Sequence, residues 1–214
     1  MNDLLRQWLA PYISSEELDE VLLASVGVHL DLLLRWNQRM NLTAVRTPEE
    51  MVRRHFGESL FAARHLLARD AELEVIDVGS GAGFPGLPLK FWAPGVRLAL
   101  VEGHGKKATF LREVGRALGL TGFEVLNQRA EGIARRAPLV TMRAVERFER
   151  SLPAAARLVA PGGRLALLIG EGQRDEALAA LPAGESEVVE LPESQRRILF
   201  TWSPAGAFHV EHQR

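Results

Sequence analysis

A glycine-rich run that follows a short apolar segment contains the residues with the clearest chemical meaning. Residues 75–86 are Val-Ile-Asp-Val-Gly-Ser-Gly-Ala-Gly-Phe-Pro-Gly. This order predicts a buried strand with an acid near its carboxyl end, then a turn into a helix. Glycines allow a tight turn and close approach of a ligand to the backbone, and a helix start presents free N–H groups. The run therefore predicts a site for a nucleotide-like cofactor; the alternative is a glycine-rich turn that holds no ligand.

The register of the glycines distinguishes two classes of cofactor. The dinucleotide fingerprint is G-x-G-x-x-G, and its last glycine lets the helix pack closely on the strand. From Gly79 the third position is the bulky Phe84, whereas from Gly81 the pattern fits but begins two residues late and encloses Pro85. An acid two positions before Gly79 instead resembles motif I of the S-adenosylmethionine-dependent methyltransferases. Asp77 would suit the cationic sulfonium and ammonium groups of that cofactor better than a pyrophosphate.

From about residue 73 the apolar pattern predicts strands that alternate with helices. The strands are expected at 73–78, 96–101, 123–126, 139–142 and 164–169, the last entered through a turn at 161–163, with two late strands at 187–191 and 197–202. The helices are expected at 84–93, 104–119, 130–136, 147–159 and 173–181. This alternation is typical of βαβ units. It predicts an α/β fold with a mostly parallel, doubly wound sheet that ends in a hairpin with one antiparallel strand.

The first 70 residues lack strand signals and predict a helical cap. The segment 14–18 resembles a helix N-cap with acids in the first turn, and Thr47 with Pro48 predicts a second helix start. Residues 41–45 predict a loop. We expect an N-terminal helical cap over 1–70, packed as one unit on a methyltransferase domain over 71–214.

Composition restricts the class of protein. The chain has 214 residues, a formal net charge of −1 and no Cys. The lack of Cys excludes disulfides, thiolate metal sites and Cys nucleophiles, and the six His show no metal-ligand spacing. No apolar run approaches the roughly 18 residues of a membrane span, and no secretory signal is visible. We expect a cytoplasmic monomer without a metal, in which nucleic-acid contacts come from a local basic patch.

Side chains at the ends of three predicted strands could complete the cofactor site. Glu102 follows the second strand and could accept hydrogen bonds from both hydroxyls of a ribose, in NAD and S-adenosylmethionine proteins alike; the alternative is a solvated acid. Ala130 and Glu131 follow the third strand, where methyltransferases usually meet the adenine edge, although an acid also suits a helix start. Arg143 ends the fourth strand, and its burial is unfavourable unless it meets a carboxylate, a phosphate or a base.

Five pieces of sequence in order carry a more specific resemblance. They are Trp36-Asn37-Gln38-Arg39-Met40-Asn41-Leu42-Thr43, Arg54-His55-Phe56-Gly57-Glu58-Ser59-Leu60, the run from Asp77 to Gly86, Lys106-Lys107 with Phe110-Leu111, and Arg129-Ala130-Glu131 leading to Arg143-Ala144. Over residues 36 to about 170 the chain resembles the bacterial 16S ribosomal RNA guanine-N7 methyltransferases, also called the glucose-inhibited division protein B family. The Asn-Leu-Thr and Gly-Phe-Pro-Gly elements are unusual among methyltransferases in general.

The resemblance implies a class I methyltransferase fold with a seven-stranded sheet, S-adenosylmethionine as cofactor, and a guanosine in the 530 loop of 16S rRNA as methyl acceptor. Cofactor contacts carried over from the family are Gly79, Phe84, Ala130, Glu131 and Arg143, to which the glycine-run and ribose arguments add Asp77, Gly81 and Glu102. The candidate RNA contacts, in naked rRNA or the small ribosomal subunit, are Arg39, Arg46, Arg53, Arg54, Lys106, Lys107 and Arg112.

Guanine N7 has a lone pair and no proton, so methyl transfer to it is an in-line displacement that needs alignment and no general base. We therefore assign no catalytic residue and keep Arg143 as a candidate. His55 could touch RNA or the cofactor, but we expect it to be structural, between cap and sheet.

The chain departs from the family at several positions. Glu102 and Glu58 stand where Asp is common, residues 137–138 replace an expected Asp, Ile169 precedes Gly170 where Lys is frequent, and the tail lacks a basic ending. These losses keep open a methyltransferase for another RNA or a small molecule. An NAD-dependent oxidoreductase and a non-catalytic ribosome-assembly factor are further alternatives. Phe84 and the lack of a Tyr-x-x-x-Lys pair disfavour the oxidoreductase, and the intact loop disfavours a vestigial site.

Overall fold

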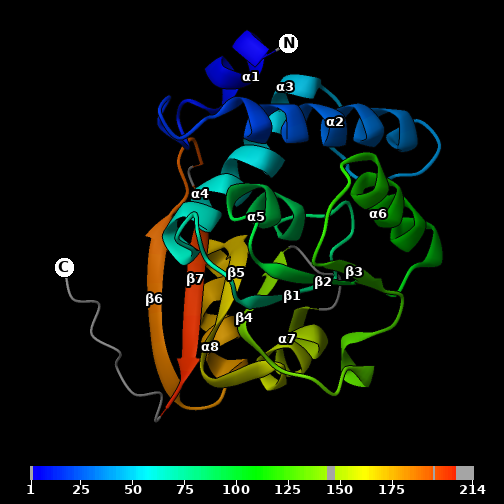
Figure 1. The fold of residues 1–214 in the computed structure, drawn as a ribbon. Coiled ribbons are helices and arrows are strands. Elements are labelled where there is room, and N and C mark those ends of the chain that lie inside the picture. Colours follow the sequence, from blue (N-terminus) through cyan, green and yellow to red (C-terminus); the bar gives the residue numbers. More distant parts are fainter. Residues whose placement is uncertain (1, 144–147, 195, 206–214) are drawn as a thin grey trace.

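The protein is a single mixed sheet with helices on both faces (Figure 1). The computed structural model describes residues 2–143, 148–194 and 196–205. The strands in these residues are β1 Glu74–Val78, β2 Arg97–Val101, β3 Phe123–Leu126, β4 Ala137–Arg143, β5 Val159–Gly170, β6 Gly184–Glu190 and β7 Arg197–Pro204. They form a 7-stranded sheet in the order β3-β2-β1-β4-β5-β7-β6. Strands β1 to β5 pair in parallel, while β7 runs antiparallel to both of its neighbours. The predicted sheet, with its one antiparallel strand in a final hairpin, is confirmed.

The helices divide between the cap and the two faces of the sheet (Figure 1). The cap contains α1 Asn2–Leu9, α2 Glu20–Asn37, α3 Pro48–Met51, the π-helix η1 Val52–Gly57 and α4 Glu58–Leu66. The later helices are α5 Gly86–Trp92, α6 Gly105–Ala117, the 3₁₀ turn η2 Ala130–Gly132, α7 Phe148–Arg157, the 3₁₀ turn η3 Glu171–Gln173 and α8 Arg174–Ala180. One buried cluster joins the cap to the α5 and α6 face, and a second lies under α7 and α8.

Two helix starts in the cap test the predictions from side-chain capping. The Thr47 hydroxyl accepts a hydrogen bond from the Glu50 N–H, and Pro48 occupies the first turn, as predicted. The start predicted at 14–18 is wrong. Helix α2 begins at Glu20, because Asp19 adopts an extended conformation and its carboxylate accepts from the Leu22 N–H at 2.7 Å. The Ser14 hydroxyl donates to Glu17 within a turn instead.

Two other segments differ from the predicted elements, and further predicted segments lie partly outside the described residues. The helix expected over 130–136 is only the short η2, since Ile133 returns to an extended conformation. The turn expected at 161–163 lies inside β5, where the pairing with β4 jumps from Val159 to Arg164 and leaves the intervening residues as a bulge. Part of the predicted element at 147–159 and of the tail falls on residues 144–147 and 206–214, which lie outside the described residues.

The cap shares its core with the sheet. Helix α2 contacts both α5 and α6, and α4 contacts α5. Buried side chains such as Leu33 and Phe56 of the cap belong to the same cluster as Leu87 of α5 and Phe110 of α6. The division into a cap over 1–70 and a domain over 71–214 stays a prediction. Within the described residues, no helix has the length and apolar character needed to cross a membrane.

Candidate cofactor site

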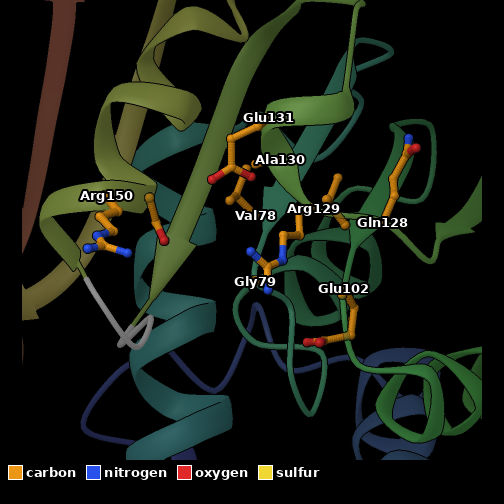
Figure 2. Close-up of a pocket in the computed structure, with 11 residues that line it drawn as sticks. Val78, Gly79, Glu102, Gln128, Arg129, Ala130, Glu131 and Arg150 are labelled. Atoms are coloured by element: carbon orange, nitrogen blue, oxygen red, sulfur yellow. The ribbon is translucent and has the colours of Figure 1, made fainter.

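A cavity of about 490 Å³ opens at the carboxyl ends of the central strands (Figure 2). Four of the residues predicted for the cofactor line it together, namely Gly79, Glu102, Ala130 and Glu131. The other lining residues are Val78, Val101, Gly103, Gln128, Arg129, Arg150 and Ser151. Ligands of open α/β sheets bind at this edge, where the strand order reverses, and here β1 separates β2 from β4.

The glycine loop between β1 and α5 owes its shape to different glycines for different reasons. Gly79 and Gly81 have φ values of 68° and 56°, a region that L side chains rarely adopt. Gly86 permits close packing, since a Cβ there would lie 2.5 Å from Leu100 Cδ2 and 2.9 Å from Asp77 Oδ2. Close helix–strand contact thus occurs at Gly86, so the bulk of Phe84 does not prevent it.

Glu102 is held in place as an acceptor on the cavity wall. Its side chain is 7% exposed. One carboxylate oxygen accepts from the Gly81 N–H at 2.8 Å, and the other accepts from the His104 N–H at 2.7 Å. Each oxygen of an ionised carboxylate has two lone-pair sites, so one site on each remains for a ligand. Two backbone donors therefore fix the Glu102 carboxylate in an orientation that can accept a pair of hydroxyls.

Asp77 lies beneath the loop, outside the residues that line the cavity. It is fully buried, and its Oδ1 accepts from the Thr141 hydroxyl at 2.7 Å. Its Oδ2 forms no well-oriented hydrogen bond within the described part of the chain, although the Gly86 N–H is near enough to the carboxylate to lower its pKa. Burial raises the pKa of Asp77 to about 6, against the lowering effect of its hydrogen bonds. An under-coordinated carboxylate at this depth favours a positive charge nearby.

The Phe84 ring stacks against two histidines of the cap. The His29 ring stacks on Phe84 at a centroid distance of 5.0 Å and 15°, and the His55 ring stacks on it at 5.0 Å and 29°. Phe56 meets the same ring edge-on at 4.9 Å. Phe84 does not line the cavity in this structure, so its cofactor contact stays a prediction. Its observed contacts anchor the loop to the cap.

The contacts of His55 are those of a structural residue between cap and loop. Its Nε2 lies 2.7 Å from the Thr43 hydroxyl, in addition to its stacking on Phe84. Burial lowers the pKa of His55 to about 2, with help from the positive charge of Arg143. His55 is therefore neutral at physiological pH.

Arg143 meets a carboxylate, which is one of the partners expected for a buried arginine in this place. Its Nη2 lies 2.9 Å from Glu58 Oε2, and the same oxygen accepts from Arg197 Nε at 3.0 Å. Burial lowers the pKa of Arg143 to about 10, while Glu58 acts in the opposite direction. Arg143 does not line the cavity, and its proposed contact with the cofactor stays a prediction. The observed pair ties the cap to β4 and β7.

Of the predicted RNA contacts, only Arg53 forms an ion pair among the described residues. Arg53 forms ion pairs with Glu49 at 2.9 Å and Glu193 at 3.5 Å, which offset its charge. Arg54 and Arg46 are exposed on the cap. Exposed Arg112 donates to a carbonyl at the end of β3, and Lys107 is half-buried on α6. Arg39 and Lys106 both line a second cavity, which is separate from the cofactor cavity.

Several residues of the site were not found from the sequence. Gln128 and Arg129 precede the predicted Ala130 and could have been included on position alone. Arg150 and Ser151 of α7 reach the cavity because α7 follows β4 at the same edge of the sheet. Arg197, which pairs with Glu58, could have been expected near this edge of the sheet. The start of an antiparallel last strand lies beside the carboxyl end of β5. Among the described residues, no cluster of acids and His could hold a metal ion.

Comparison with known proteins decides the family. The family model described as rRNA small subunit methyltransferase G matches residues 23–194. The chain belongs to the rRNA small subunit methyltransferase G family. A member from Xanthomonas campestris pv. campestris (strain B100) is 39% identical over 178 residues, which cover 82% of each chain. Another, from Stenotrophomonas maltophilia (strain K279a), is 41% identical over 174 residues and 80% of each chain.

Solved structures support the fold. TrmN from Thermus thermophilus matches with a TM-score of 0.56 at 22% identity, over 72% of this chain and 53% of that one. M. jannaschii TYW2 in complex with AdoMet matches with a TM-score of 0.54 at 13% identity, over 68% and 74%. As a member of the family, the chain is a methyltransferase with S-adenosylmethionine as its cofactor. The oxidoreductase and non-catalytic alternatives are set aside.

His29 offers a test of how the cap supports the glycine loop. Its Nε2 lies 2.8 Å from the Ala82 carbonyl oxygen, which requires the proton on Nε2. Burial lowers the pKa of His29 to about 4, so the ring is neutral near pH 7. Replacing His29 with Leu removes the donor and leaves the Ala82 carbonyl unpaired, which we expect to lower the free energy of unfolding by about 1–3 kcal/mol and to weaken cofactor binding.

Urea denaturation and titration calorimetry with S-adenosylmethionine measure the two effects. His65→Leu is the matched control, since the exposed His65 makes the same kind of bond to the Phe61 carbonyl at 2.8 Å. A His29→Leu variant as stable as the His65→Leu variant, with unchanged affinity, would show that the loop holds its shape without the cap.

Proposed function

We propose that this protein transfers the methyl group of S-adenosylmethionine to N7 of a guanosine in the 530 loop of 16S rRNA. The observation that carries the proposal is the family match over residues 23–194, which includes every residue that lines the cofactor cavity. We further propose that the protein is a cytoplasmic monomer that requires no metal. The substrate is 16S rRNA, either free or in a small ribosomal subunit.

The residues of the cavity fit the cofactor. A volume of about 490 Å³ falls in the range of sites for small molecules and cofactors. We assign the ribose hydroxyls to the fixed Glu102 carboxylate, the adenine edge to Ala130 and Glu131, and the methionine end to the loop from Gly79 to Gly81. The Oδ2 atom of Asp77, which forms no well-oriented hydrogen bond in the described part of the chain, is the group suited to the cationic end.

The reaction requires little chemistry from the protein. S-Adenosylmethionine supplies, when bound, a methyl group on a sulfonium that leaves as a neutral thioether. The guanine N7 lone pair attacks without loss of a proton, so no side chain needs to act as a base. The chain contributes alignment through a loop fixed by Glu102 and by the contacts of His29 and Phe84. Phe84 and Arg143, which contact the cap in this structure, complete the proposed set of cofactor contacts.

Cofactor affinity is expected to fall about tenfold when the pH is lowered from 7 to 5. The pKa of Asp77 is raised to about 6, so protonation below pH 6 removes the negative charge that favours the cationic cofactor. His29 and His55, with pKa values of about 4 and about 2, do not change charge in this range. Titration calorimetry at several pH values measures the effect, and Asp77→Asn should bind weakly with a flat profile. A sloping profile in Asp77→Asn would assign the titration to another group.

The function is tested by methyl transfer from tritiated S-adenosylmethionine to 16S rRNA and to small subunits from cells that lack this gene. Borohydride–aniline treatment then cleaves RNA at N7-methylguanosine. Cleavage at one guanosine of the 530 loop is the expected result. Labelled RNA that resists cleavage would show that an atom other than N7 is methylated. An absence of label with cofactor binding intact would contradict the proposed substrate.

A further inference from the structure

A second cavity, of about 560 Å³, lies between the end of α2 and the start of α6. It is lined by Arg35, Trp36, Gln38, Arg39, Met40, Lys106 and Glu113. The segment from Trp36 to Met40 thus supplies much of the wall, although it does not reach the cofactor cavity. The two cavities flank the start of α6, since Gly103 lines the first and Lys106 the second.

Three cations line this second cavity, and the described part of the chain offers them no ion-pair partner. Arg35, Arg39 and Lys106 are exposed, and none forms an ion pair within the described residues. Glu113 is the single acid among the lining residues. The excess of positive charge favours an anionic ligand, and arginine forks match phosphate geometry.

Trp36 and Met40 supply the apolar part of the wall, next to the polar Gln38. Trp36 is half-buried, and its ring meets Phe110 of the core at a centroid distance of 5.7 Å and 64°. The loop after α2 is fixed by Asn37, whose side-chain oxygen accepts from the Thr43 N–H at 3.0 Å. An anchored indole beside unpaired cations is the combination that binds unpaired nucleotides, with the base stacked on the ring and the phosphate on the cations.

We propose that this cavity binds one unpaired nucleotide of the RNA substrate, next to the nucleotide that is methylated. Its base stacks on Trp36, its phosphate binds Arg39 and Lys106, and the Glu113 carboxylate can accept from an amino group of the base. The inference rests on the proposed RNA substrate and adds a docking point beyond the cofactor cavity. A loop nucleotide held here would fix the position of its neighbour relative to the glycine loop.

The test measures binding of fluorescein-labelled hexaadenylate RNA by fluorescence anisotropy at low salt, without methyl transfer. Arg39→Gln combined with Lys106→Gln is expected to weaken binding about tenfold or more. The matched control combines Arg116→Gln with Arg174→Gln, two exposed cations outside the cavity that likewise form no ion pair in the described chain. Equal binding by the two double variants would overturn the proposal.

The stacking contribution needs its own variants. Trp36→Leu is expected to weaken binding about tenfold, and Trp36→Phe, which keeps an aromatic face, to stay within about threefold of the native protein. Unchanged S-adenosylmethionine affinity shows that each variant is folded. If Trp36→Leu binds the RNA as well as the native protein does, the cavity binds phosphate alone and the proposal fails.

The outcomes separate this inference from the proposed function. If the protein methylates 16S rRNA but all variants bind the hexanucleotide equally, the proposed function stands and this nucleotide site is rejected. If the hexanucleotide binds through the cavity but no methyl group is transferred to rRNA, the site stands and the proposed function is rejected.

Discussion

Replacing Glu58 with Gln is expected to lower the free energy of unfolding by about 3–5 kcal/mol. The Glu58 side chain is 3% exposed, and one of its oxygens pairs with both Arg143 at 2.9 Å and Arg197 at 3.0 Å. The Arg143 side chain is itself only 7% exposed. Removing the carboxylate leaves two arginines without their shared counter-charge, and an uncompensated buried charge is more unfavourable than a lost surface pair.

Urea denaturation of the native protein and two comparison variants tests this result. Glu49→Gln removes an exposed ion pair with Arg53 at 2.9 Å and should change stability by less than about 1 kcal/mol. Glu58→Asp keeps the charge on a shorter side chain and should lose less than Glu58→Gln. If Glu58→Gln and Glu49→Gln are equally stable, water solvates the two arginines or other groups compensate their charge, and the cap is held by its apolar core alone.

Loss of the Glu58 carboxylate should also affect the cofactor site, because the Arg143 guanidinium contacts the cap at several points. Besides Glu58, it donates to the backbone carbonyls of Arg54 and His55. His55 in turn stacks on Phe84 of the glycine loop. The described contacts therefore form a continuous path from β4 through the cap to the loop, and loosening of the Glu58 pair would reach the cofactor site through Arg143 and His55.

The order of strands and helices was predictable because the strands are short apolar runs separated by turn residues. The pattern predicts both ends of segments such as Phe123–Leu126. Capping was predictable only where the sequence offered one candidate. Thr47 followed by Pro48 had no competitor, whereas two serines and two acids precede Asp19, and only the tertiary position of α2 decides which side chain caps it.

The candidate site was predictable where position along a parallel strand determines position in space. Gly79, Glu102, Ala130 and Glu131 all follow strands that end at the same edge, and they line one cavity. Phe84, Asp77 and Arg143 were expected to contact the cofactor, and the structure places them in contacts with the cap or beneath the loop. Those contacts depend on how the cap packs on the sheet, which periodicity does not encode.

Replacing Glu102 with Ala is expected to weaken S-adenosylmethionine binding about 30- to 150-fold, equivalent to about 2–3 kcal/mol. Two effects add in this variant. The charged acceptor for the proposed ribose hydroxyls disappears, and the Gly81 and His104 N–H groups, which now donate to Glu102 at 2.8 and 2.7 Å, lose their partner. Because Gly81 belongs to the glycine loop, the second effect loosens the methionine end of the site as well.

Glu102→Gln separates these two contributions. The Gln amide keeps one acceptor oxygen and the approximate shape of Glu, so it should preserve one of the two backbone bonds and show an intermediate affinity in titration calorimetry. Glu124→Ala is a suitable control, because Glu124 is an exposed acid on β3 that pairs with Arg135 and does not line this cavity. If Glu102→Ala binds S-adenosylmethionine as tightly as Glu124→Ala does, the ribose does not contact Glu102, and the orientation proposed for the cofactor is wrong.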